Sequence, residues 1–135
     1  MINQYLSQNE LAVMQALWNS GKALSRPEIL DAIENNDWNP NSIHLVLNNL
    51  IEKGFVEVSG ITRCGRGYGR TYKAVKTRIG YGAGLALDVI SANQNSDSIV
   101  DMVSTMVRES EADNDTIARL EEMLSQYRKE INKDS

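Results

Sequence analysis

The sequence is poor in cysteine and histidine, and this scarcity excludes two kinds of site. Cys64 is the only cysteine among the 135 residues, and His44 is the only histidine. One thiol cannot form an internal disulfide, and a metal site built from several cysteines or histidines is excluded as well. We therefore predict a protein of the reducing cytoplasm that carries neither a metal nor another cofactor.

Long apolar runs are also absent. The longest uncharged run, around Ile79 to Leu87, is interrupted by glycine and is too short to cross a bilayer. The first six residues lack the basic and apolar regions of a signal peptide. Nor does any carboxylate pair, nucleophile–base pair or phosphate-binding loop indicate an enzyme. The sequence thus predicts a non-enzymatic globular protein with no membrane segment.

Acidic residues are missing from one long stretch, between Glu57 and Asp88. The net charge of −4 hides an uneven distribution, because residues 1–78 carry a net charge of +2 and residues 79–135 carry −6. Such a basic stretch either forms a solvated loop or binds phosphate groups. Its basic residues are Arg63, Arg66, Arg70, Lys73, Lys76 and Arg78.

Three helices are predicted in the first half of the chain. Residues 7–10 and 25–28 are capping boxes, in which a serine N-cap precedes a glutamate by three positions. The third helix is expected to begin at Asn39 as N-cap, with Trp38 and Ile43 as a hydrophobic staple, and to end at Gly54. One face of this helix is apolar and predicts core. The opposite face carries Asn41, Ser42, His44, Leu45, Asn48, Asn49 and Glu52.

A β-hairpin is predicted after the third helix. Residues 55–58 and 71–75 alternate as strands do, and residues 60–69, rich in glycine and arginine, are expected to form a long basic loop. Helices are predicted over residues 96–107 and 113–131. Between the hairpin and these helices, Gly80, Gly82 and Gly84 would weaken a helix or allow close packing. In the last helix, apolar residues recur at alternating spacings of three and four, a seam that needs an apolar partner.

Three helices followed by a basic hairpin predict a mainly α fold with a small β-hairpin, a winged helix-turn-helix. The third helix would enter the major groove of double-stranded DNA, where asparagine suits adenine, and the hairpin would contact the backbone. His44 would contact a base or a phosphate, or be merely solvated. Cys64 is either redox-sensitive or an incidental thiol. The candidate DNA-binding residues are Asn41, Ser42, His44, Leu45, Asn48, Asn49, Arg63, Arg66, Arg70 and Lys73.

Several motifs resemble the penicillinase repressor family: Leu11-Ala-Val-Met14, Leu17-Trp18, Leu47-Asn-Asn-Leu50, Lys53-Gly54 and Gly69-Arg-Thr-Tyr72. The resemblance implies a homodimeric repressor of an inverted-repeat operator. It assigns DNA binding to residues 1–78 and dimerisation to a helical segment, residues 79–135. The dimerisation residues it implies are Ile99, Val103, Met106, Ile117, Leu120, Leu124, Tyr127 and Ile131.

The sequence departs from the family at four points. Asn49 stands where the family usually has arginine, and Leu45 where it often has threonine. Thr105-Met106 occupies the position of the Asn-Phe bond that is cleaved in β-lactam-responsive members, and the Cys-x-Cys motifs of copper-responsive members are missing. The inducing signal therefore stays open. The acidity of the chain and Asn49 favour an alternative function. In that alternative the chain is a winged-helix protein-interaction module or anti-repressor that has lost DNA binding.

Overall fold

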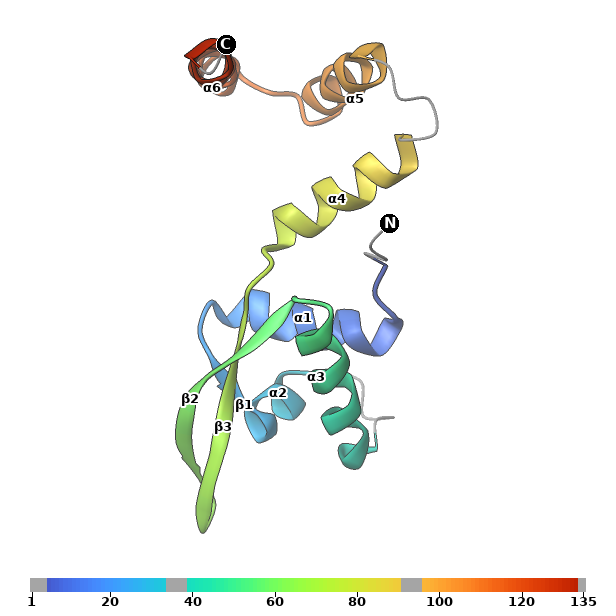
Figure 1. Ribbon diagram of the computed structural model, residues 1–135. Coiled ribbons are helices and arrows are strands. Elements are labelled where there is room, and N and C mark those ends of the chain that lie inside the picture. Colours follow the sequence, from blue (N-terminus) through green and yellow to red (C-terminus); the bar gives the residue numbers. More distant parts are fainter. Residues whose placement is uncertain (1–4, 34–38, 91–95, 134–135) are drawn as a thin grey trace. The chain divides into compact units, whose positions relative to one another are not determined.

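The computed structural model describes residues 5–33, 39–90 and 96–133 (Figure 1). The chain divides into two compact units, residues 1–89 and residues 90–135. The described residues of the first unit form a winged helix-turn-helix, so the predicted fold class is confirmed. Its elements are α1 (Gln8–Ser20), β1 (Leu24–Ser25), α2 (Arg26–Ala32), a 3-10 turn (Pro40–Ser42), α3 (Ile43–Glu52), β2 (Val56–Cys64), β3 (Gly67–Ala74) and α4 (Arg78–Ile90), of which Ile90 lies in the second unit.

Both predicted capping boxes are present. The Ser7 hydroxyl accepts a hydrogen bond from the Glu10 amide, and the Glu10 carboxylate accepts one from the Ser7 amide. Ser25 and Glu28 repeat this arrangement at the start of α2. The hydrogen bonds from the Ser25 backbone and hydroxyl hold the pKa of Glu28 below its ordinary value. Two of the three helices that precede the β2–β3 hairpin, α1 and α2, therefore begin where the residue spacing predicts.

Glu10 is also buried, and its charge is satisfied by a residue from another helix. The Lys53 ammonium, at the end of α3, lies 2.8 Å from the Glu10 carboxylate. Burial raises the pKa of Glu10, but the Lys53 and Ser7 hydrogen bonds together with the Lys53 charge outweigh that effect and leave the pKa below 4.5. The buried carboxylate accepts hydrogen bonds from the Ser7 amide and the Lys53 ammonium, and so ties the first turn of α1 to the end of α3.

We expect Glu10→Gln to lower the free energy of unfolding by about 1–2 kcal/mol at neutral pH, because glutamine keeps the cap but loses the charge opposite Lys53. A carboxylate whose pKa is depressed by folding contributes stability above its unfolded pKa and loses it as the pH falls through its folded pKa. Below about pH 4.5, the free energy of unfolding should therefore fall less steeply for the variant than for the wild type. Urea unfolding from pH 7 to pH 3 measures both effects.

The control for this variant is Glu57→Gln, which removes an exposed ion pair with Lys73. Because both partners are half exposed, the expected loss is below about 1 kcal/mol. Equal losses for the two variants would contradict the assigned role of Glu10.

The core of the first unit lies where α1 and α3 pack against the sheet. Its largest fully buried side chains include Met14, Ile29, Leu47, Leu50 and Phe55. These residues come from α1, α2, α3 and the segment before β2, so the apolar stripes of the predicted helices do form one common core. Packing them together fixes the orientation of α3 and leaves its other face exposed.

The start of the third helix differs partly from the prediction. The Asn39 side chain does cap it, accepting from the Asn41 amide, but the first turn is a 3-10 turn and α3 itself begins at Ile43. Gly54 follows the helix at a φ of 81°, a conformation that favours glycine, so the predicted end is confirmed. Trp38, the other half of the predicted staple, lies outside the described residues.

The predicted basic loop over residues 60–69 is wrong, because most of it is strand. β2 and β3 pair as far as Cys64 and Gly67, and only two residues, Gly65 and Arg66, connect them. Gly65 has a φ of 59°, as the first central residue of a tight hairpin turn favours. A bulge at Ser59 shifts the register, and β1 completes a sheet of order β1-β3-β2. Backbone pairing forms this ladder even where glycine supplies no side chain.

Helix α4 forms across the three glycines that were expected to weaken a helix. Tyr81 in its first turn packs against Trp18 and Phe55, with ring centroids 6.0 and 5.7 Å away. The Tyr81 hydroxyl accepts a hydrogen bond from the Leu6 amide at 3.1 Å. Apart from its own neighbours along the helix, Gly82 has no atom of the described residues within 4 Å of the place where a side chain would begin. Close packing in the described part of the chain therefore does not explain why glycine stands at this position. Tertiary contacts of one tyrosine outweigh the low helix propensity.

The second unit consists of α5 (Ser96–Glu109) and α6 (Asn114–Lys133). Both predicted helices are confirmed, and Asp113 caps α6 by accepting a hydrogen bond from the Thr116 amide. This bond lowers the pKa of Asp113. The second unit begins at residue 90, twelve residues after the predicted domain boundary at residue 78. That DNA binding and dimerisation divide at this boundary stays a prediction.

Candidate nucleic-acid interface

The face of α3 that points away from the core carries the side chains predicted to contact DNA. Asn41 precedes this helix in the 3-10 turn and is exposed, as are Asn48 and Asn49 within it. Leu45 is 69% exposed, which is unusual for a leucine on a helix that also contributes to the core. Ser42 is half-buried. Apart from Leu45 and Glu52, the exposed side chains of this face are polar and carry no carboxylate or ammonium, and the asparagine amides both donate and accept hydrogen bonds.

The β2–β3 hairpin extends in the same direction as α3, and α2 lies between the two in the view of Figure 1. Arg63 on β2, Arg66 in the turn and Arg70 on β3 are all exposed. Lys73 differs from them because its ammonium lies 3.0 Å from the Glu57 carboxylate on the paired strand. Three arginines on one extended hairpin form a concentrated positive surface that suits phosphate oxygens.

Sequence reasoning missed two residues that the fold brings to this surface. Arg26, the first residue of α2, places its guanidinium against the ring of His44 on α3. Tyr68 on β3 is 77% exposed and stands opposite Arg63. One feature of the sequence could have indicated Arg26. A cation in the first turn interacts unfavourably with the helix dipole, so its presence there suggests a role other than helix stability.

A cleft of about 390 Å³ separates α3 from the hairpin. Residues from α2, from the start of α3 and from both strands line it, so the two predicted DNA-binding elements and Arg26 share one concave surface. Its lining comprises Arg26, Pro27, Leu30, Asn41, Ile43, His44, Cys64, Tyr68, Gly69 and Arg70.

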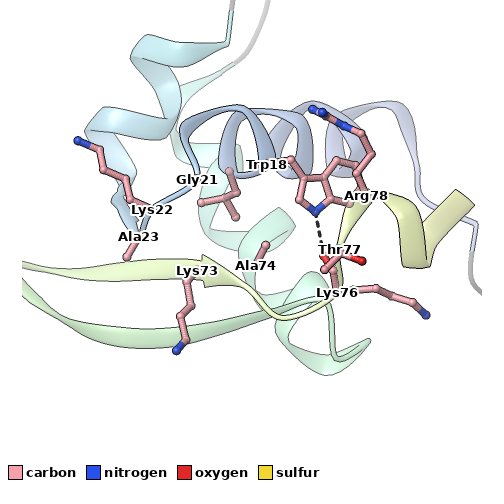
Figure 2. A pocket seen from close by; sticks show the side chains of 10 residues that line it. Trp18, Gly21, Lys22, Ala23, Lys73, Ala74, Lys76, Thr77 and Arg78 are labelled. Atoms are coloured by element: carbon pink, nitrogen blue, oxygen red, sulfur yellow. Dashed lines mark hydrogen bonds between the residues drawn. The ribbon is translucent and has the colours of Figure 1, made fainter. Parts of the chain in front are cut away.

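A second cavity, of about 410 Å³, lies where β3 leads into α4 (Figure 2). The Trp18 indole N–H donates a hydrogen bond to the Lys76 carbonyl at 2.8 Å, and Arg78 lies over the Trp18 ring while donating to the Asn19 side chain. These contacts hold the first turn of α4 against α1. The cations around this cavity point outward in Figure 2, away from any common centre.

The second unit exposes much apolar surface. On α5, Ile99, Val103 and Met106 are 41–53% exposed, and on α6 Leu124 and Tyr127 are more than half exposed. Ile117 and Ile131 are exposed too, and Leu120 is half-buried. Exposed apolar surface of this extent is unusual on helices otherwise rich in charge.

Other kinds of site find little support in the described part of the chain. No group of three histidine, cysteine or acidic side chains there could hold a metal ion. None of the described helices combines the length and the apolar character needed to span a bilayer. Cys64 is half-buried in the cleft and forms no disulfide.

One comparison with known proteins identifies a family. A family model described as "Penicillinase repressor" matches residues 6–126. No curated protein matches the chain. Among solved structures, a MarR family regulator from Neisseria meningitidis is similar, with 18% identity and a TM-score of 0.41 over 96% of this chain and 78% of that one.

Proposed function

Because the chain belongs to the penicillinase repressor family, we propose that it is a homodimeric repressor that binds a specific inverted-repeat operator. Family membership makes the chain a DNA-binding transcriptional regulator, and not an enzyme. The finer proposal is carried by one observation, the exposed amide-bearing face of α3 beside a hairpin with three exposed arginines. A cytoplasmic location follows from access to the chromosome.

In the proposed complex, residues 1–78 bind DNA and α3 lies in the major groove. Asn48 and Asn49 are candidates for pairing with adenine, whose N7 and N6 groups match the acceptor and donor of a side-chain amide. Arg63, Arg66 and Arg70 contact the backbone or the adjacent minor groove. Lys73 contributes less in this scheme, because Glu57 offsets its charge.

Dimerisation is assigned to residues 79–135. The support for this assignment is the apolar surface that α5 and α6 expose in a single chain. A dimer with twofold symmetry presents two copies of α3, so its operator is an inverted repeat with half-site centres one or two helical turns apart, multiples of about 34–36 Å. The acidic residues of this segment repel phosphates and therefore face away from the operator.

The test is selection of bound sequences from a random library of duplex DNA by the full-length protein. The proposal requires an inverted repeat, bound with a dissociation constant of about 10⁻⁸ M or lower near physiological salt. If no sequence is enriched and binding does not depend on salt, the alternative gains support, a winged-helix protein that binds other proteins.

Base reading and backbone contact are expected to respond differently to substitution. Asn48→Ala should relax the preference at one position per half-site, by about 1–3 kcal/mol. Arg66→Ala should instead weaken binding to all sequences alike. Repeating the selection with each variant distinguishes the two effects, and an unchanged preference for Asn48→Ala would contradict the proposed docking of α3.

A further inference from the structure

The cleft between α3 and the hairpin gathers hydrogen-bond donors from three separate elements. Arg26 comes from α2, His44 from α3 and Arg70 from β3. Arg26 is half-buried and its guanidinium contacts the His44 ring, while Arg70 is exposed. None of the described residues that line the cleft is acidic. Two positive charges and an imidazole are thus held together with no carboxylate among them.

Neither arginine of the cleft forms an ion pair within the described chain. The ion pairs there involve other cations, such as Lys53 with Glu10 and Lys73 with Glu57. Holding two like charges at one concave surface is unfavourable unless an anion is bound there. The arrangement therefore suits an anion supplied by a partner.

The position of the cleft identifies that anion. When α3 lies in the major groove and the hairpin reaches the adjacent minor groove, the strand that divides the two grooves must run between them. The space between them is the cleft itself. We propose that it receives one phosphodiester of the DNA backbone, held by Arg26, His44 and Arg70. This assignment rests on the proposed DNA-binding function and adds Arg26 to the residues that perform it.

The chemistry of the cleft suits a sugar-phosphate unit. Guanidinium groups donate several N–H bonds in a planar fork that matches phosphate oxygens, and an imidazole keeps at least one N–H in every protonation state. Leu30 and Cys64, both half-buried, contribute apolar surface against which a deoxyribose ring can pack. His44 accordingly serves as a backbone contact that fixes register, and not as a reader of base sequence.

The first experiment compares variants on the operator selected by the wild-type protein. Arg26→Ala and Arg70→Ala should each weaken binding about tenfold or more, to operator and to unrelated duplex alike, and should reduce the salt slope by about one. The control, Lys22→Ala, removes the same charge from an exposed residue that lines the other cavity, and should change affinity less than threefold. Arg26→Lys keeps the charge and should restore part of the affinity.

The second experiment identifies the phosphate directly. Operators carrying a single uncharged methylphosphonate at successive positions should reveal one linkage per half-site where neutralisation weakens wild-type binding about tenfold and weakens binding of Arg26→Ala clearly less, since only Arg70 and His44 still contact that linkage in the variant. Such non-additivity is expected only if Arg26 and that linkage interact. Thermal unfolding of the variant should match that of the wild type, so that loss of folding does not account for the result.

Each outcome of these experiments decides the assignment. Equal losses for Lys22→Ala and Arg26→Ala, or additive effects at every linkage, would overturn the phosphate site while leaving the DNA-binding function in place. Failure of the wild-type protein to bind any duplex would overturn both.

Discussion

Leu124→Glu should convert the protein from a dimer to a monomer at micromolar concentration. Leu124 lies in the middle of the α6 seam and is 55% exposed in a single chain. In the proposed dimer the new carboxylate would be buried without a partner, at a cost of about 3–5 kcal/mol, which raises the dimer dissociation constant by two to four orders of magnitude. Sedimentation velocity measures the change.

Loss of the dimer should also reduce operator affinity strongly, because the two half-sites would then be bound by independent chains. The matched control is Ser125→Glu, one position along the helix and about 100° around it from Leu124. Its carboxylate stays in water and gains Lys129 as an i,i+4 partner. A wild type that sediments as a monomer, or a Leu124→Glu variant that stays dimeric, would refute the proposed interface.

Phe55→Ala should produce the largest loss of stability in the first unit. The side chain is 2% exposed, its ring packs edge-on against Tyr81, and the Lys76 ammonium lies 5.0 Å from the ring centroid. Removing the ring leaves a cavity among α3, β2 and α4, with an expected loss of about 3–5 kcal/mol and a melting temperature lower by more than about 10 °C.

Phe55→Leu is the control, since it keeps most of the buried volume and should cost less than about 1.5 kcal/mol. Hydrogen exchange gives a second readout. The Tyr81 amide, which donates to the Thr77 carbonyl at 2.9 Å, should exchange faster in Phe55→Ala, because Tyr81 loses one of the two rings that hold the first turn of α4. If calorimetry shows less than about 1 kcal/mol of destabilisation for the alanine variant, Phe55 does not have the central role assigned to it.

The features that were predicted correctly depend on residues close together in sequence. A serine followed by a glutamate three positions later fixed the starts of α1 and α2, and Gly54 marked the end of α3. Apolar residues at helical spacing identified the core side of α3, and with it the exposed side that carries Asn48. Each of these signals acts over about four residues, the range of a helical turn, so it can be recognised without the rest of the fold.

The features that were missed depend on pairing or packing between two segments, which the residues of one segment do not reveal. Glycines over residues 60–69 suggested a loop, but the backbone amides and carbonyls of β2 and β3 pair regardless of side chain. Tyr81 stabilises a glycine-rich helix through rings at positions 18 and 55.

The cleft that holds Arg26, His44 and Arg70 depends on the same kind of contact. These three residues come together only because α2, α3 and β3 pack around one common core. Sequence by itself therefore determined where most of the helices lie and which side of α3 is exposed, because the causes of both are local. Only the tertiary structure decided which distant charges share one surface, because long-range packing leaves no periodic trace in the residues that it unites.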